Sequence, residues 1–275
     1  MAEPVPGIDP NVALDAAAVP IRPAATVMLV RDVVDGAGIE VFMLQRTTKA
    51  AFGPGMYVFP GGRVDGVDGA DEIAPFCRGL DDVEASAQLG VAQGGLAFWV
   101  AAVRECFEEA GVLLASPRDG GALVLRNEDR HEVHDSSLSL LDLCRRDDLV
   151  MELSTTHYVD HWVTPLGEPR RFDTRFFLTE MPHDQEPLHD DKETVQSLWT
   201  RPREALRRQA AGELTMMPPT IFNLRFLERF DSAAEALAAG AAIEQPARIL
   251  PKLRVNDDGR VLGIALPSDA DYDDL

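Results

Sequence analysis

Runs in which apolar and polar residues alternate lie between runs in which apolar residues recur every three or four positions. The alternating runs predict strands at residues 24–31, 40–46, 56–59, 157–164, 170–179 and 194–200, with further short strands at 123–125 and within 249–266. The helical spacing predicts helices at residues 81–89, 96–110, 126–149, 202–211, 219–230 and 232–239. The first two strands flank Asp35-Gly36-Ala37-Gly38, which is a hairpin signature.

The predicted helix at residues 96–110 carries three carboxylates on one face. Glu105, Glu108 and Glu109 stand at positions i, i+3 and i+4, within one turn of each other. Three like charges so close repel one another, whereas Mg²⁺ takes oxygen ligands and keeps sites open for substrate phosphates. The other face is apolar, with Trp99, Val103, Phe107 and Ala110 at helical spacing. We therefore expect a helix that packs into a core, presents a metal-binding face and ends at Gly111.

A turn upstream of this helix is the second part of the candidate site. Tyr57-Val58-Phe59 is a short β-like run, and Pro60-Gly61-Gly62 interrupts it. Because glycine carries no Cβ, such a turn lets the backbone approach a ligand closely.

These two stretches together resemble the Nudix box, which reads G-x5-E-x7-R-E-U-x-E-E-x-G-U with U an apolar residue. Gly62 corresponds to its first glycine, and its second half is matched by Arg104, Glu105, Glu108, Glu109, Gly111 and Val112. Asp68 stands six residues after Gly62, where the pattern has Glu. Thirty-five residues separate Asp68 from Arg104 instead of seven, so about 28 residues are inserted in the box.

The inserted box is similar to that of one branch of the Nudix hydrolase superfamily, which includes a mammalian peroxisomal coenzyme A diphosphatase. The resemblance extends to residues 45–47 and 54–59, to His161-Trp162-Val163-Thr164-Pro165 and to residues 171–177. It spans roughly residues 24–230 and implies an α/β fold, the Nudix-type α/β/α sandwich with a mixed sheet and an additional α-helical insertion. We expect a flexible leader (1–20), a Nudix hydrolase domain (21–245) with insertions at 63–95 and 126–150, and a C-terminal extension with an acidic tail (246–275).

The resemblance implies metal-dependent hydrolysis of a nucleoside diphosphate linked to another group. Mg²⁺ or Mn²⁺ would be held by Glu105, Glu108 and Glu109 together with Gly61, and would activate the attacking water. We expect Glu105 to accept the proton of that water, with Glu193 on a later loop as the other candidate base.

Other residues have expected roles in substrate binding or in the structure of the box. We expect Arg46, Gly62 and Arg175 to contact the substrate. Arg170, Arg171 and Arg175 are candidates to hold phosphates, because guanidinium groups match phosphates. The alternative for Arg175 is a place on the charged outer face of a strand. We expect Arg104 to pair with a carboxylate and orient the box, and Gly111 to cap the helix.

Composition narrows the choice of partners. A formal net charge of −20 argues against nucleic-acid polymers and anionic membranes, while a small phosphorylated substrate remains compatible because a metal reverses the local sign. The three cysteines lack C-x-x-C spacing, which favours free thiols over a zinc site. With no signal-peptide pattern and no long apolar run, we expect a cytoplasmic protein, with a homodimer as a possible assembly.

The choice of substrate and the role of the insertion stay open at this stage. Coenzyme A or acyl-coenzyme A is the first choice of substrate through the branch resemblance, with ADP-ribose or dinucleotide diphosphatase activity and a non-catalytic nucleotide sensor as alternatives.

We interpret the acidic start of the first insertion as a solvated loop, since it lacks EF-hand spacing. We expect residues 63–95 to form a wall or lid that selects the non-nucleotide half of the substrate. Replacing residues 70–92 by a Gly-Ser linker should then alter substrate preference more than stability.

Overall fold

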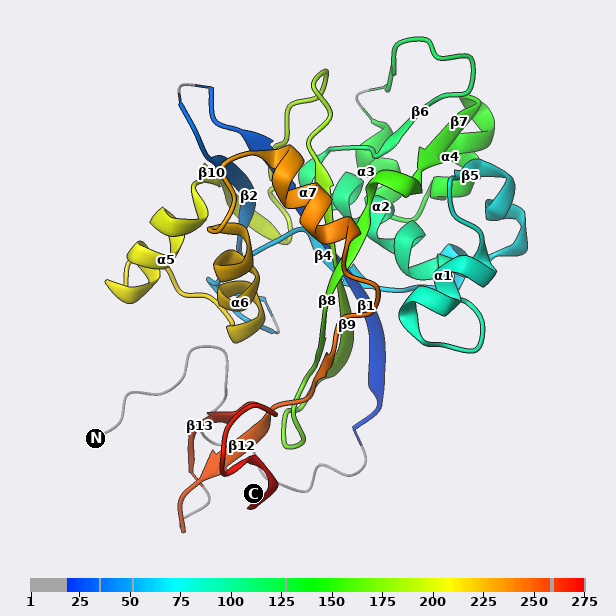
Figure 1. Cartoon of the computed structure of the whole chain (residues 1–275). Coiled ribbons are helices and arrows are strands. Elements are labelled where there is room, and N and C mark those ends of the chain that lie inside the picture. The colour runs from blue at the N-terminus through cyan, green and yellow to red at the C-terminus, as the bar shows by residue number, and fades with distance from the viewer. Residues whose placement is uncertain (1–18, 35, 51, 127, 258–259, 275) are drawn as a thin grey trace.

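A mixed β-sheet forms the centre of the molecule (Figure 1). The computed structural model describes residues 19–34, 36–50, 52–126, 128–257 and 260–274. Within these residues the main strands, in the order β10-β2-β1-β9-β8-β11, are Thr194–Thr200, Ile39–Arg46, Ile21–Asp32, Arg171–Glu180, His157–Val163 and Arg248–Ile249. β1 and β9 are parallel, whereas β1–β2, β2–β10 and β8–β9 are antiparallel.

Two short strands bring the glycine turn into this sheet. β3 (Tyr57–Val58) pairs with β2, and β4 (Gly61–Arg63) pairs with the first half of β1. Gly61 lies opposite Thr26, and a Cβ at Gly61 would lie 2.5 Å from the carbonyl oxygen of Ala25. Only glycine therefore fits at this position, where β4 pairs with β1.

Helices cover both faces of the sheet. These helices are α2 (Leu96–Ala110) on one face, and α5 (Pro202–Ala210), α6 (Pro218–Leu227) and α7 (Ala233–Ala241) on the other. Alternation along β1 explains the two cores, because Ala25, Val27 and Leu29 are buried with α2 while Met28 and Val30 are buried with the other helices. The predicted α/β/α sandwich around a mixed sheet is confirmed.

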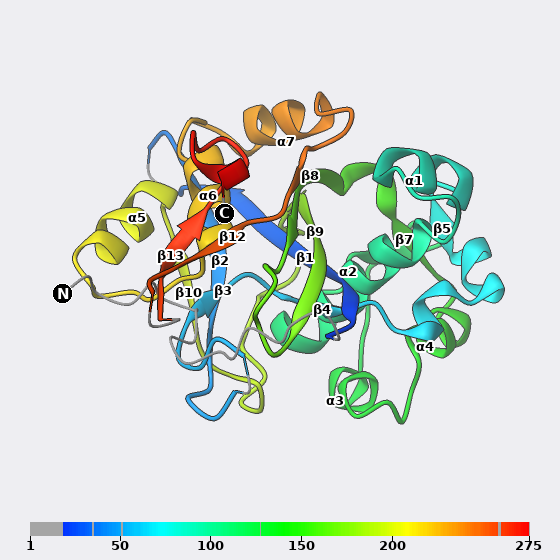
Figure 2. The same cartoon turned by 90° about the horizontal axis from the view of Figure 1, so that it is seen from below.

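The inserted segments form a layer beside α2 (Figure 2). The elements of this layer and its surroundings are η1 (Gly66–Gly69), η2 (Asp71–Phe76), β5 (Cys77–Arg78), α1 (Asp82–Leu89), β6 (Ala115–Pro117), α3 (Asp129–His134), α4 (Leu140–Arg146), β7 (Leu149–Glu152) and η3 (Leu153–Thr155). β5 from the first insertion pairs with β7 from the end of the second, and β6 completes a small separate sheet. The layer is therefore not purely helical as predicted, because backbone pairing joins the two insertions.

The C-terminal residues return to the main sheet and then leave it. β11 pairs in parallel with β8, while β12 (Lys252–Val255) and β13 (Val261–Ala265) form a separate antiparallel pair, followed by η4 (Tyr272–Asp274). Arg254 on β12 forms ion pairs with Asp269 and Asp271, which tie the acidic tail to this pair of strands.

Most predicted elements are present, and α2 has the predicted bounds. The strand predicted at 123–125 is wrong: Leu123 packs against the core and Val124 is exposed, but the segment pairs with no other strand of the described residues. The helix predicted at 126–149 is divided into α3 and α4, which are separated by Ser136 with a φ of 58°. Residue 127 of that prediction lies outside the described residues.

Two further expectations concern the leader and membranes. The predicted leader at 1–20 falls outside the described residues except for its last two positions. None of the helices in the described ranges combines the length and the apolar character needed to cross a bilayer.

Candidate active site

Residues of the inserted layer fix both ends of α2. At its start, the carboxylate of Asp82 on α1 accepts a hydrogen bond from the N–H of Leu96 at 3.0 Å. That N–H has no acceptor within its own helix, so Asp82 caps α2 from a neighbouring element. At its end, Arg130 of α3 donates to the carbonyl oxygens of Glu108 and Glu109 at 3.0 and 2.8 Å. The carboxylate-bearing turn is therefore held from both sides.

This arrangement changes what is expected of the first insertion. The sequence predicted that replacing residues 70–92 would affect substrate preference more than stability, and the structure argues against this. α1 supplies the cap Asp82, and its side chains Ala85 and Leu89 are buried in the core around α2. Only the first part of the insertion, up to Ile73, borders the cavity described below.

Arg104 organises the acidic face of α2. Its Nε and Nη2 donate to the two carboxylate oxygens of Asp68 at 2.8 and 2.9 Å. Its Nη1 donates to Glu105 at 2.9 Å and to Glu108 at 3.1 Å. The side chains of Arg104 and Asp68 are 8% and 1% exposed, so this is a buried pair with good bidentate geometry. Asp68 thus fills the place of the box Glu despite the inserted residues.

The glycine turn lies directly against the carboxylates. The N–H of Gly61 donates to Glu109 at 2.9 Å. A Cβ at Gly62 would lie 2.5 Å from the Oε1 of Glu105, so a larger residue would displace that carboxylate. The Pro-Gly-Gly sequence predicted a close approach of the backbone to a ligand, and the structure shows a close approach to the carboxylates of α2.

Burial makes the negative charges on this face unfavourable in the protein alone. Glu105 and Glu109 are 9% and 3% exposed. Burial raises the pKa of Glu105 to about 8, although the charge of Arg104 opposes the shift. Burial, together with the charge of Glu105, raises the pKa of Glu109 well above its usual value. Burial also raises the pKa of Glu108. A bound cation would relieve this cost.

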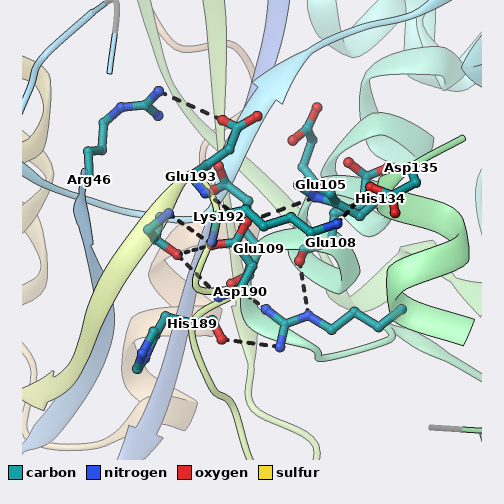
Figure 3. Close-up of polar contacts among 12 residues, drawn as sticks. Arg46, Glu105, Glu108, Glu109, His134, Asp135, His189, Asp190, Lys192 and Glu193 are labelled. Carbon is teal, nitrogen blue, oxygen red and sulfur yellow. Dashed lines mark hydrogen bonds and ion pairs between the residues drawn. The ribbon is translucent and has the colours of Figure 1, made fainter. Parts of the chain in front are cut away.

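The loop before β10 faces α2 across the site (Figure 3). Asp190 fixes its shape, because its carboxylate accepts backbone N–H groups two to four residues further on. Glu193 points towards Arg46, with 3.8 Å between Oε2 and Nη2, and its side chain is 55% exposed. Lys192 reaches Asp135 beside α3, with 2.7 Å between Nζ and Oδ1.

One cavity of about 1110 Å³ joins these parts. Its walls are the carboxylate face of α2, the glycine turn, the Glu193 loop, one face of β1 and β9, and parts of both insertions. Residues of α6 and of the β12–β13 pair line its other end. The cavity is therefore much longer than a diphosphate alone requires, and the carboxylates lie along its course.

Comparisons with known proteins agree with this site. The family model described as the NUDT19 Nudix domain matches residues 74–227. A human protein named acyl-coenzyme A diphosphatase NUDT19 is 32% identical over 275 residues, which cover 86% of this chain and 72% of that protein. This chain belongs to the NUDT19 Nudix domain family.

Other members and a solved structure extend this result. The Gallus gallus protein named acyl-coenzyme A diphosphatase NUDT19 is 30% identical over 284 residues, covering 85% of this chain and 74% of that protein. The crystal structure of a Nudix hydrolase from Alicyclobacillus acidocaldarius superposes with a TM-score of 0.69 at 31% identity, over 81% of this chain and 97% of that one. The chain is thus a Nudix hydrolase by family and by fold.

Nudix hydrolases depend on a divalent metal, and the side chains on the acidic face of α2 are of the chemical type that binds such a metal. They offer carboxylate oxygens, which hard divalent cations prefer, and two of them are buried close together with raised pKa values. No three such side chains converge as a preformed metal cage in the part of the chain that the structure describes. Arg104 holds Glu105 and Glu108, and Gly61 holds Glu109, so metal binding must compete with these hydrogen bonds.

The structure brings most predicted site residues of this family member to one cavity. Those that line it are Arg46, Gly61, Gly62, Arg104, Glu105, Glu108, Glu109 and Glu193. Gly111 ends α2 with a φ of 70° and donates its N–H to the carbonyl of Phe107, as predicted for the cap. Glu105, Glu108 and Glu109 come from one helix, whereas Arg46 and Glu193 come from adjoining ends of the paired strands β2 and β10.

Arg175, predicted to contact the substrate, does not line the cavity. Thr174 and Phe176 of β9 face the cavity, so the side chain of Arg175 points to the opposite face of the strand. There it is 5% exposed and forms an ion pair with Asp173. The structure therefore does not bring Arg175 to this cavity, and the arginine of this segment that lines it is Arg170.

Several residues that shape the site were not predicted. These residues are Asp82, Arg130 and Asp190. They hydrogen-bond to parts of the chain whose proximity the sequence does not show. Asp190 could have been found from the local sequence, because an acidic residue shortly before a Thr often shapes a turn. Its carboxylate accepts hydrogen bonds from the N–H and the hydroxyl of Thr194. The solvated-loop interpretation is wrong for Asp68, which is 2% exposed, and its place in the box pattern was the available signal.

Proposed function

We propose that this protein hydrolyses the diphosphate of coenzyme A or acyl-coenzyme A, leaving one phosphate on each half. The observation that carries the proposal is the buried carboxylate face of α2, which opens into a cavity long enough for a substrate on both sides of its diphosphate. The relatives from Homo sapiens and Gallus gallus are named acyl-coenzyme A diphosphatases, which supports this choice of substrate.

In this proposal, Mg²⁺ or Mn²⁺ is held by Glu105, Glu108 and Glu109, with a carbonyl of Gly61 as a further oxygen ligand. When bound, the metal neutralises phosphate oxygens and lowers the pKa of a water. Arg104 keeps two of the carboxylates oriented through its hydrogen bonds.

Glu105 accepts the proton of the attacking water in this proposal. Its carboxylate lines the cavity, and Gly62 leaves room for it beside the turn. Glu193 is the second candidate, because it lines the same cavity from the opposite loop.

Cations and aromatic rings at the other end of the cavity support a place for the nucleotide half. Arg22, Arg46 and Arg170 line the cavity there and suit phosphate groups. The rings of Phe52 and Phe172 lie 5.7 Å apart between their centroids and also line it, so they offer apolar faces to a base. We include Gly62 among the residues that contact the substrate.

The wider setting of the protein stays a prediction from the sequence. We propose that it acts in the cytoplasm on a small phosphorylated substrate, without a nucleic-acid polymer or a membrane as partner. The homodimer is likewise a proposal, which light scattering of the purified protein would test.

Activity on a panel of substrates tests the proposed function. Purified protein with Mg²⁺ is incubated with coenzyme A, octanoyl-coenzyme A, ADP-ribose, a dinucleotide and a nucleoside triphosphate, and the products are identified by mass spectrometry. We expect the highest kcat/KM for the coenzyme A substrates, with solvent ¹⁸O in one product phosphate. A preference for ADP-ribose or a dinucleotide would refute the substrate, and tight nucleotide binding without turnover would indicate a sensor.

Two matched variants test the base. If Glu105 is the base, Glu193→Gln keeps the acidic limb of the kcat–pH profile and most of the rate, whereas Glu105→Gln loses both. Loss of that limb in Glu193→Gln, with metal affinity intact, would place the base on the loop instead.

A further inference from the structure

The cavity has an aliphatic end that the diphosphate chemistry does not use. Both insertions build it, and its apolar lining residues include Val67, Ala70, Ile73, Val133, Leu138 and Leu141. The first three follow the glycine turn, in η1, in η2 and at the residue between them, and the others belong to α3, α4 and the turn between them. Two segments about 60 residues apart in the chain therefore form one apolar wall.

This wall continues from the carboxylates along α2. Val100, Arg104 and Glu108 are spaced four residues apart on one side of the helix, and all three line the cavity. Eight residues of helix rise about 12 Å, so the lining passes from carboxylate to aliphatic side chain over that distance. A chain attached to a diphosphate held at Glu108 would thus run directly along this wall.

The second insertion is fixed against the first, so the wall is a built feature. α4 contacts η2, and Ile73 and Val133 belong to the same buried cluster as Val100. The pairing of β5 with β7 joins the two insertions behind it. Figure 2 shows α3 and α4 on the same side of α2, away from the β12–β13 pair at the other end.

The two ends of the cavity differ in chemistry. The end near Arg22, Arg170 and Phe172 has cations and aromatic rings, which suit a phosphorylated nucleoside. At the inserted end the aliphatic wall is bordered by His134, Ser136 and Ser139, and by Lys192, whose Nζ pairs with Asp135. The wall itself suits an alkyl chain, because burying it removes apolar area from water, and the neighbouring cations Arg104 and Lys192 are already paired with carboxylates.

We propose that the wall formed by the two insertions binds the acylated pantetheine arm of the substrate, and thereby sets the preference for acyl chains. This inference rests on the proposed function, because it assumes a coenzyme A thioester at the carboxylates. It also refines the predicted role of the first insertion, since the selecting surface is its first part together with residues 133–141 of the second.

Half-buried leucines of the wall allow a test that spares the core. Leu141→Asn and Leu138→Asn keep the side-chain size and make the wall polar, and Leu237→Asn, a half-buried leucine on α7 outside the cavity, is the matched control. Affinity is measured calorimetrically without metal for each half of the substrate, S-octanoyl-4′-phosphopantetheine and adenosine 3′,5′-bisphosphate. The ratio of kcat/KM for octanoyl-coenzyme A to that for coenzyme A is measured with Mg²⁺.

The expected result is a selective loss for the acylated half. Leu141→Asn should weaken S-octanoyl-4′-phosphopantetheine about tenfold and lower the kcat/KM ratio by a similar factor, since an apolar pocket discriminates by about this much per lost contact. Adenosine 3′,5′-bisphosphate should bind as before, and Leu237→Asn should change neither value. Unchanged octanoyl binding and an unchanged ratio in both wall variants would overturn the inference.

The outcomes separate this inference from the proposed function. If the protein hydrolyses coenzyme A but the wall variants leave the ratio of kcat/KM for octanoyl-coenzyme A to that for coenzyme A unchanged, the proposed function holds and the binding site for the acylated arm is refuted. If the protein does not hydrolyse coenzyme A but Leu141→Asn weakens binding of the acylated half, the proposed function is refuted and the binding site is supported. Equal weakening of both halves would indicate a general distortion and would also overturn the assignment.

Discussion

Replacing Glu109 by Gln should make the protein more stable without metal and much less active with it. Glu109 is 3% exposed, its pKa is raised by burial and by the charge of Glu105, and its fixed partner is the N–H of Gly61 at 2.9 Å. The amide oxygen of Gln can still accept from Gly61, so the turn keeps its contact. The variant loses only the buried negative charge, which the protein alone holds at a cost.

The two effects have different sizes. Removing one of three charged oxygen ligands should lower kcat on the order of 10²-fold, which corresponds to about 2.7 kcal/mol of activation free energy. Relief of the buried charge should stabilise the metal-free fold by about 1 kcal/mol, or roughly 2–4 °C in Tm for a chain of this size. Activity should fall while stability rises, because the negative charge of Glu109 helps to bind the metal but makes folding less favourable.

Thermal unfolding with and without metal measures both effects on one sample. In EDTA, Glu109→Gln should have the higher Tm, and Mg²⁺ should raise the Tm of the unsubstituted protein more than that of the variant, because only ligands that bind the folded state stabilise it. Glu180→Gln, at the exposed end of β9, is the matched control and should change neither Tm nor kcat. A folded Glu109→Gln protein with near-normal turnover, or one less stable in EDTA by more than 1 kcal/mol, would refute the reasoning.

Three further predictions concern residues that hold the site. Asp82→Ala should lower the free energy of unfolding by about 1–2 kcal/mol in urea, because the N–H of Leu96 loses its cap. Arg130→Ala should raise the Mg²⁺ concentration for half-maximal activity severalfold, while kcat at saturating Mg²⁺ changes less, which a metal titration measures. Asp129 is fully buried, which raises its pKa, but hydrogen bonds from Arg146 and Arg126 together outweigh burial and lower the pKa to about 2 from 3.8. It therefore stabilises the fold above pH 3.8, so Asp129→Asn should cost about 2 kcal/mol at pH 7, and the difference should vanish in urea titrations as the pH falls towards 2.

The parts of the site that the sequence could predict are local in the chain. Glu105, Glu108 and Glu109 share a face because of helical spacing alone, and the bounds of α2 follow from its apolar periodicity and Gly111. The sequence predicted that Arg104 pairs with a carboxylate and placed Asp68 at the Glu position of the box, and the structure shows that these two residues are partners.

The parts that could not be predicted depend on register or on contacts between distant segments. Whether Arg175 or a neighbour faces the cavity depends on a strand alternation whose phase is set by the pairing of β9 with β1. Nothing near Arg130 in the sequence shows that its side chain reaches the carbonyls of Glu108 and Glu109. The segment at Leu123 shows that a strand-like pattern in the sequence is not sufficient, because without a partner strand it forms no sheet.

The insertions and the metal helix are best understood as one unit. The carboxylates lie in the last two turns of α2, where the negative end of the helix dipole already disfavours more negative charge. Arg130, from the second insertion, donates to the carbonyls at that end, and Asp82, from the first, satisfies the N–H at the other. The insertions therefore offset the electrostatic cost of the acidic face while their apolar side chains form the wall beside it. Shortening either one should consequently lower metal affinity and stability together, even where no residue that contacts substrate is removed.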